Sequence, residues 1–121
     1  MLGTVAAGFP SPAEEELADT ISLEELLIRD KDATYLLKVN GDSMIEAGIL
    51  PGDYLLVERG AAPRDGDIVI AQIDREWTMK YFRRRGEKVF LEAANKNYQP
   101  IHPTEELKIA AVVRSVVRRY L

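Results

Sequence analysis

The fold of this chain is decided by residues 67–82, which read DIVIAQIDREWTMKYF. Residues 67–73 form a nearly continuous apolar run, typical of a strand buried on both faces. Asp74-Arg75 makes a short connection to a second β-rich run that starts at Glu76. The pattern predicts a β-hairpin, although this connection lacks the glycine that tight hairpin turns usually carry.

The second strand of this hairpin has two different faces because side chains alternate along a strand. One face carries Thr78, Lys80 and Phe82, and the other carries Trp77, Met79 and Tyr81. The direction of Lys80 therefore depends on which face is turned inward.

Similar β-rich runs surround the hairpin. The last run, rich in Val and Ile, is expected to be an edge strand able to pair with a second copy of the chain. Turn signals of Gly, Pro and Asp separate the runs. Besides the hairpin, strands are expected at 34–39, 54–57, 88–93 and 107–120, with one helical turn within 44–49. The fold class expected is mostly β, built from compact twisted antiparallel sheets.

One short helix is expected at residues 21–30, before the first strand. Ser22 and Glu25 have the spacing of a capping box, and Ile21 and Leu26 that of a hydrophobic staple. We expect the helix to pack on the body through the apolar face made by Leu23, Leu26 and Leu27.

The composition is that of one ordinary globular domain. The chain has 121 residues, of which 46% are hydrophobic and 30% charged. Its net charge of -4 argues against general nucleic-acid binding. The absence of cysteine excludes disulfides and thiolate metal sites and is consistent with a cytoplasmic protein. No apolar run reaches the length of a membrane span, and the N-terminus lacks the pattern of a signal peptide.

A candidate catalytic nucleophile, Ser43, lies in the turn Gly41-Asp42-Ser43-Met44, which follows an apolar strand. A serine hydroxyl needs a neighbouring base to act as a nucleophile. The chain has no cysteine and one histidine, His102, so Lys80 is the natural candidate. Burial among the apolar side chains of its strand would favour the neutral amine that a base requires.

Each of these features also has a simpler explanation. Most Gly-x-Ser-x sequences are turns, most strand lysines are solvated, and a loop histidine is usually a surface residue. Arg83-Arg84-Arg85-Gly86 suggests nucleic-acid binding, but a charged hairpin tip is more common. Since no Asp, Glu or His cluster with ligand spacing surrounds His102, neither a metal site nor a cofactor is expected.

A third stretch, Val5 to Pro12 (VAAGFPSP), favours the chemical interpretation. With it, the chain resembles the LexA/UmuD family of self-cleaving serine proteases from about Val5 to the last strands, and most closely its UmuD-like members. The stretches that carry the resemblance, in order, are AGFPSP (7–12), ATY (33–35), GDSM (41–44), GD (52–53), GDIV (66–69) and TMK (78–80).

The resemblance implies a fold of the LexA C-terminal-domain type, with residues 1–20 as a cleavable arm and 21–121 as the protease and dimerisation domain. It implies a cut between Ala7 and Gly8, with Ser43 as nucleophile and Lys80 as base. The backbone N–H groups of Asp42 and Ser43 are expected to form the oxyanion hole. The expected partners are a second copy of the chain, the RecA–single-stranded DNA filament and an error-prone Y-family polymerase subunit, with no sequence-specific DNA contact by the chain itself.

The function expected first is that of an SOS mutagenesis factor, because six residues before Ala7 leave no room for a helix-turn-helix domain. The arm is shorter than the family usually has. The alternative is the self-cleaving and dimerising domain of a LexA-type repressor. Two further classes stay open: a trans-acting peptidase of the signal-peptidase kind, and a non-catalytic module in which Ser43 and Lys80 are incidental.

Overall fold

The structure is a computed structural model that describes residues 20, 22–103 and 106–121. The expected arm up to residue 19, including the expected cut between Ala7 and Gly8, lies outside the described residues. The elements in chain order are α2 (Leu23–Leu27), the 3-10 turn η1 (Lys31–Ala33), β1 (Thr34–Lys38), the 3-10 turn η2 (Ile45–Ala47), β2 (Tyr54–Arg59), β3 (Ile68–Ile73), β4 (Glu76–Arg85), β5 (Lys88–Glu92) and β6 (Leu107–Val117).

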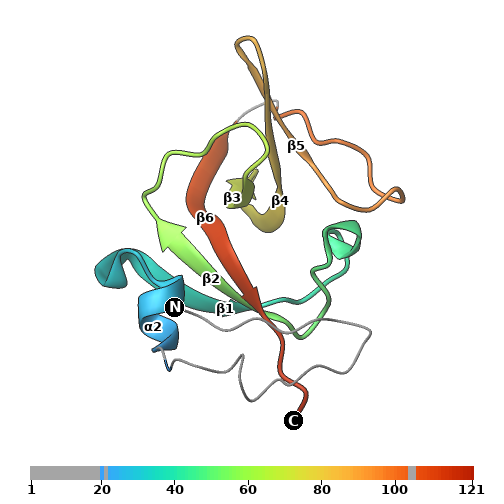
Figure 1. Cartoon of the computed structure of the whole chain (residues 1–121). Coiled ribbons are helices and arrows are strands. Elements are labelled where there is room, and N and C mark those ends of the chain that lie inside the picture. Colours follow the sequence, from blue (N-terminus) through green and yellow to red (C-terminus); the bar gives the residue numbers. More distant parts are fainter. Residues whose placement is uncertain (1–19, 21, 104–105) are drawn as a thin grey trace.

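The strands form one six-stranded sheet in the order β1-β2-β6-β3-β4-β5. Every neighbouring pair is antiparallel, and the sheet is strongly twisted (Figure 1). The expectation of a mostly β fold with twisted antiparallel strands and one short helix is confirmed. The described residues contain no helix long and apolar enough to span a membrane.

The expected edge position of the last strand is wrong. β6 runs through the middle of the sheet, where Leu107 to Val112 pair with β3 and Ala111 to Val117 pair with β2. The alternating Val and Ile residues fit a central strand as well as an edge strand, so the pattern could not distinguish them. Within the described sheet, β6 pairs on one side alone from Val113 onward.

The expected hairpin is confirmed without a glycine. β3 and β4 pair from Ile68 with Tyr81 to Ile73 with Glu76. Asp74 and Arg75 both have positive φ, at 49° and 72°, as the favoured two-residue turn requires. Asp is among the residues that adopt this conformation at modest cost.

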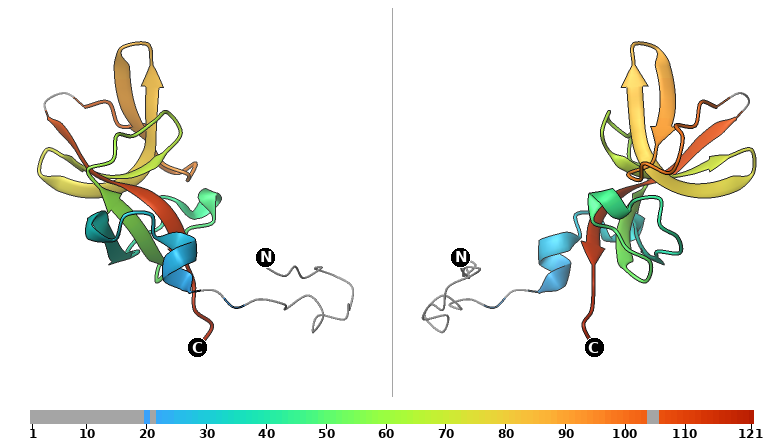
Figure 2. Two further views of the ribbon diagram at one scale, coloured as in Figure 1. Left: turned by 60° about the vertical axis from the view of Figure 1, so that its left-hand side comes forward. Right: turned by 90° about the vertical axis from the view of Figure 1, so that its right-hand side faces the viewer.

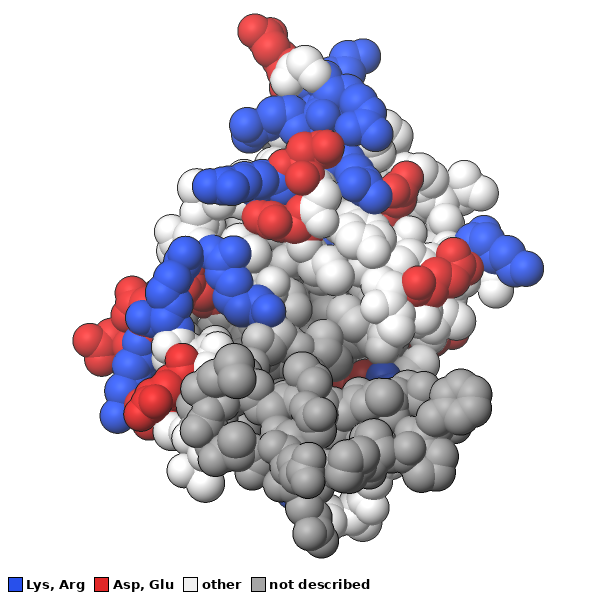
Figure 3. Space-filling view, viewed as in Figure 1, with Lys and Arg blue, Asp and Glu red and all other residues white. Residues whose placement is uncertain are grey.

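The arginine run is not the expected turn. Arg83 to Arg85 belong to β4 and pair with β5, and the turn lies at Gly86-Glu87. The β4–β5 hairpin stands out from the rest of the sheet, at the opposite end from the C-terminus (Figure 2). Figure 3 shows its basic side chains interspersed with acidic ones. Two arginines of β4 form ion pairs with acidic residues: Arg83 with Glu92 at 3.0 Å and Arg85 with Asp65 at 3.4 Å.

The helix is shorter and more exposed than expected. α2 has five residues, and the Ser22 hydroxyl accepts a hydrogen bond from the N–H of Glu24 at 3.2 Å, in place of the expected pairing with Glu25. Leu23 and Leu26 are 69% and 49% exposed, so the prediction that this face is core is wrong. A helix of barely more than one turn presents too narrow a face to cover the sheet. Ile21, the expected staple partner, lies outside the described residues.

Two apolar clusters form the core, one on each face of the sheet. Neighbouring residues of β6 point into different clusters: Ala111 belongs to one cluster and Val112 to the other. The same alternation holds on β3, where Val69 is fully buried in one cluster and Ile70 is half-buried against the other. The strand expected to be buried on both faces is therefore covered on both, although unequally.

Candidate active site

The serine turn is held at both ends by buried side chains. Val39, directly after β1, and Met44 are 7% and 1% exposed and lie in the same apolar cluster. Between them, Gly41 has a φ of 140°, which favours glycine, and the chain reverses through Asp42 and Ser43. The 3-10 turn η2 then follows, as expected for residues 44–49. A rigid turn of this kind presents Ser43 at a fixed place.

Lys80 is a buried amine with no acidic partner among the described residues. It lies on β4, is 7% exposed, and no carboxylate of the described residues is within ion-pair distance. Its Nζ donates to Thr78 Oγ1 and, at 3.2 Å, to the carbonyl oxygen of Met79. Burial lowers the pKa of Lys80 from its usual value of 10.5, which favours the neutral form.

Ser43 and Lys80 meet at one backbone oxygen. Ser43 Oγ donates to the same Met79 carbonyl, also at 3.2 Å. Both side chains line a cleft of about 420 Å³ between the serine turn and the start of β4. The residues around this cleft are Leu37, Lys38, Val39, Asn40, Gly41, Asp42, Ser43, Leu55, Ile70, Trp77, Thr78, Met79, Lys80 and Tyr98. The structure thus brings the predicted serine and lysine together.

The two backbone N–H groups expected to form an oxyanion hole are available for a ligand. Among the described residues, no acceptor pairs with the N–H of Asp42 or Ser43. Both residues line the cleft that also holds the serine hydroxyl. Donors beside a nucleophile can stabilise the negative oxygen that forms when a carbonyl is attacked.

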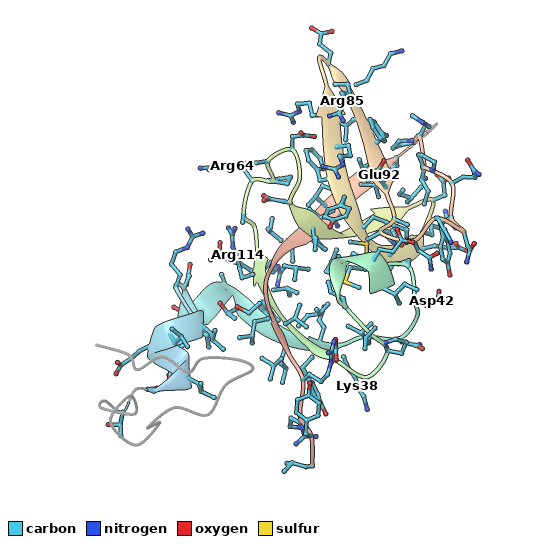
Figure 4. All side chains as sticks on the ribbon, turned by 45° about the vertical axis from the view of Figure 1, so that its right-hand side comes forward. Lys38, Asp42, Arg64, Arg85, Glu92 and Arg114 are labelled. Atoms are coloured by element: carbon cyan, nitrogen blue, oxygen red, sulfur yellow. The ribbon has the colours of Figure 1, made fainter. Side chains whose placement is uncertain are left out.

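The loop after β5 contributes two residues that the sequence did not single out. Tyr98 lines the cleft, its hydroxyl donates to Asp42 Oδ1, and its ring lies 5.9 Å from Lys80 Nζ. The hydrogen bond to Asp42 raises the pKa of Tyr98. Asn95 is 3% exposed and donates to the Asp42 carbonyl at 2.9 Å. Figure 4 shows Asp42 on the side of the molecule where this loop runs. A polar residue in a loop carries no pattern that marks it in advance.

A buried ion pair supports the turn that follows. Asp53 is 2% exposed and accepts two hydrogen bonds from Arg118, both at 2.7 Å. Arg118 also donates to the carbonyl of Gly48 at 2.8 Å, and Leu50 N–H donates to Asp53 at 2.9 Å. The Arg118 hydrogen bond lowers the pKa of Asp53 to about 2. The pair joins the end of β6 to the segment that carries η2.

Neither His102 nor any acidic cluster forms a metal centre in the described residues, where no group of three or more His, Cys, Asp or Glu could hold an ion. The His102 ring stacks on Phe90 with centroids 5.1 Å apart.

Sequence comparison with known proteins assigns the chain to a family. A model of the family described as "Peptidase S24-like" matches residues 1–114. The chain belongs to this family, which is a family of serine peptidases.

Curated relatives agree with this assignment. The chain is 39% identical to the LexA repressor of Desulfatibacillum aliphaticivorans over 98% of its length and 60% of that protein. It is 44% identical to the LexA repressor of Streptomyces avermitilis over 98% of the chain and 50% of the relative. The match to the LexA repressor of Sorangium cellulosum is 45% over 84% of the chain and 44% of the relative. The chain therefore spans about half the length of the curated relatives that it matches.

Proposed function

We propose that residues 21–121 form the self-cleaving domain of a LexA-type SOS repressor and that residues 1–20 are its substrate arm. The observation that carries the proposal is a serine hydroxyl and a buried lysine amine, free of any described carboxylate, that meet at the Met79 carbonyl in one cleft. A structural lysine would be expected to reach solvent or an acidic partner.

The proposed reaction starts with neutral Lys80. The Ser43 hydroxyl rotates from the Met79 carbonyl toward Lys80 Nζ, which takes its proton as the oxygen attacks the carbonyl carbon of Ala7. The N–H groups of Asp42 and Ser43 bind the resulting oxyanion. When the intermediate collapses, the Ala7–Gly8 bond breaks and Lys80 returns the proton to the Gly8 amine. Water then hydrolyses the ester through the same lysine and restores Ser43.

This mechanism fixes the sign of the pH dependence. Lys80 acts as a base when it is neutral, so the rate rises with pH through its lowered pKa and then levels off. The residues at the proposed cut fit this mechanism. Ala7 and Gly8 are small, so an extended peptide can approach the serine turn closely.

The names of the relatives favour the repressor over the mutagenesis factor. The three relatives described above are called LexA repressor, and the chain covers about half of each. Homodimerisation and stimulation of cleavage by a RecA filament are proposed on the same family resemblance. The role of the product as a polymerase subunit has no support beyond that resemblance, so it ranks second.

Intact-mass spectrometry after incubation at alkaline pH tests the proposal. The parent chain should lose Met1 to Ala7, while Ser43→Ala and Lys80→Ala should keep their full mass. Lys88→Ala is the matched control, because Lys88 is an exposed strand lysine on β5. It should cleave like the parent.

A peptide spanning Val5 to Pro12, added in trans, separates the ways in which the test can fail. Cleavage of the peptide by a chain that does not cut itself would show an active site that its own arm does not reach. A parent that cleaves neither its arm nor the peptide would overturn the proposal.

A further inference from the structure

Asn95 lies beside the serine turn, where its side chain contacts the carbonyl of Asp42. It is 3% exposed and lines a neighbouring hollow together with Glu46, Ala94 and Lys96. It is absent from the lining of the cleft that holds Ser43 and Lys80. Its contact with the catalytic segment is the hydrogen bond to Asp42, so we expect any effect on the reaction to act through the turn.

Both ends of the Asn95 amide have a defined partner. The Oδ1 atom accepts the N–H of Asn97 at 3.0 Å, and the Nδ2 atom donates to the Asp42 carbonyl at 2.9 Å. Since only the oxygen accepts and only the nitrogen donates, the Asn97 contact determines which atom faces Asp42. Asn95 is thus a fixed donor to the peptide that joins Asp42 to Ser43.

That peptide carries the Ser43 N–H. A trans peptide is planar, so its N–H and C=O point in opposite directions, and the described residues contain no cis peptide bond. The Asp42 carbonyl accepts from Asn95 at 2.9 Å and also from the N–H of Ile45 at 3.3 Å, so the Ser43 N–H points away from both donors. Ser43 itself lines the cleft. No described residue accepts a hydrogen bond from this N–H.

The loop that carries Asn95 is itself fixed to the turn. Glu46 N–H donates to the Ala94 carbonyl at 2.7 Å, and Ala94 N–H contacts the Met44 sulfur at 3.3 Å. Lys96 N–H donates to the Glu46 carboxylate at 2.8 Å. The loop and the turn therefore form one rigid unit, which is what a preorganised donor requires.

We propose that Asn95 is a positioning residue that holds the Asp42–Ser43 peptide with its N–H directed into the cleft as an oxyanion donor. The inference rests on the proposed self-cleavage and adds a residue to it. Loss of one oxyanion donor typically lowers kcat by about 100- to 1,000-fold. A donor that is present but badly aimed should lower it by about 10- to 100-fold.

The test compares Asn95→Ala and Asn95→Asp with the parent, using the first-order rate of self-cleavage and the kcat and KM for the Val5 to Pro12 peptide. Asn95→Asp keeps the size of the side chain and the acceptor for Asn97 but lacks the donor to Asp42. Asn97→Ala is the matched control, because that residue is exposed and contacts Asn95 through its backbone N–H. Thermal unfolding of each variant shows whether it is folded.

The expected result is a fall of about 10- to 100-fold in kcat and in the self-cleavage rate for both Asn95 variants, with KM unchanged. In Asn95→Ala, which adds no charge, the midpoint of the pH–rate profile should also be unchanged. Asn97→Ala should match the parent. A purely structural role would instead lower the amount of folded protein, without a fall in kcat per folded molecule.

Two results would overturn the inference alone: an active parent with a folded Asn95→Asp variant of equal kcat, or an Asn95→Asp variant that does not fold. If Asn95→Ala does not fold, the kcat of the folded Asn95→Asp variant decides whether the inference holds. A parent inactive in both assays, beside an equally inactive Ser43→Ala, would overturn the proposed function and this inference with it.

Discussion

Lys80 and Asp53 are both buried charged residues, and their surroundings differ in one respect. Asp53 is 2% exposed and accepts a bidentate pair of hydrogen bonds from Arg118, both at 2.7 Å. Lys80 is 7% exposed and contacts a hydroxyl and a carbonyl, with no described carboxylate in reach. Arg118 holds Asp53 in its charged form, whereas burial lowers the pKa of Lys80 and favours its neutral form.

The comparison separates structural from chemical charges. An ion pair with good geometry keeps both groups ionised, so neither can exchange a proton near neutral pH. A buried amine without an acidic partner can exchange one and is a candidate for acid–base chemistry. The arrangement around Asp53 therefore fits a structural role, and the arrangement around Lys80 fits the base that we propose.

The largest expected effect comes from replacing Lys80 by a cation that stays charged. Arginine is not deprotonated in proteins, so Lys80→Arg keeps the charge and removes the base. General-base catalysis contributes about 100- to 10,000-fold, and we expect the self-cleavage rate to fall within that range. The rate is measured by mass spectrometry, with Lys88→Arg as control. A Lys80→Arg variant as fast as the parent would show that proton transfer by Lys80 is not required.

Removing the charge of Asp53 should lower the stability of the fold without a comparable fall in the self-cleavage rate. Asp53→Asn leaves Arg118 without its carboxylate, and we expect the melting temperature at pH 7 to fall by about 5–10 °C. Because the folded state lowers the pKa of Asp53 from 3.8 to about 2, the stabilisation is present above the usual pKa and disappears as pH falls toward 2.

The measurement is thermal unfolding of parent and variant between pH 7 and pH 2. The difference in melting temperature should stay constant down to about pH 4 and then narrow from the usual pKa of 3.8 as the pH falls towards 2. Glu87→Gln, at the exposed hairpin turn, should show no gap. A gap at pH 7 that persists unchanged at pH 2 would contradict the charge-based explanation.

Lys80 should show the opposite dependence. Its pKa in the folded state is lowered below 10.5, so the unfolded chain binds more protons and the buried charge costs stability at neutral pH. We expect Lys80→Met to melt a few degrees above the parent at pH 7, with the difference shrinking as pH rises towards 10.5. Unfolding curves across this pH range measure it, with Lys88→Met as control. A difference that does not change with pH would argue that packing, and not charge, is responsible.

The smallest effect is expected where a buried charge has two partners. Glu58 contacts Arg29 at 2.6 Å and Arg114 at 3.0 Å, and the first of these contacts is the larger cause of its lowered pKa. Arg29 is largely exposed, so Arg29→Ala should lower the melting temperature by about 1–3 °C while Arg114 still pairs with Glu58. In a Glu58→Gln background, Arg29→Ala should lower the melting temperature by a smaller amount. An equal cost in both backgrounds would mean that the contact with Glu58 contributes nothing.

The sequence placed most of the strands because their signals are local. Apolar runs bounded by Gly, Pro and Asp marked β1, β2, β3 and β5 to within a few residues. The Asp74-Arg75 turn was also predicted, since its length alone defines a hairpin. The errors at α2 and β6 have a common cause: exposure and position in the sheet depend on which other elements cover a segment, and no local pattern carries that information.

The candidate site divides in the same way. Residue chemistry made Ser43 and Lys80 candidates, because a serine after an apolar strand and a lysine within one are each visible locally. The resemblance to the LexA/UmuD family then singled them out as a pair. The burial of Lys80, its lack of a described acidic partner, and the contacts of Asn95 and Tyr98 with Asp42 were decided by tertiary structure alone. Chain segments some fifty residues apart meet at this turn, and a contact of that kind depends on the fold and not on neighbouring residues.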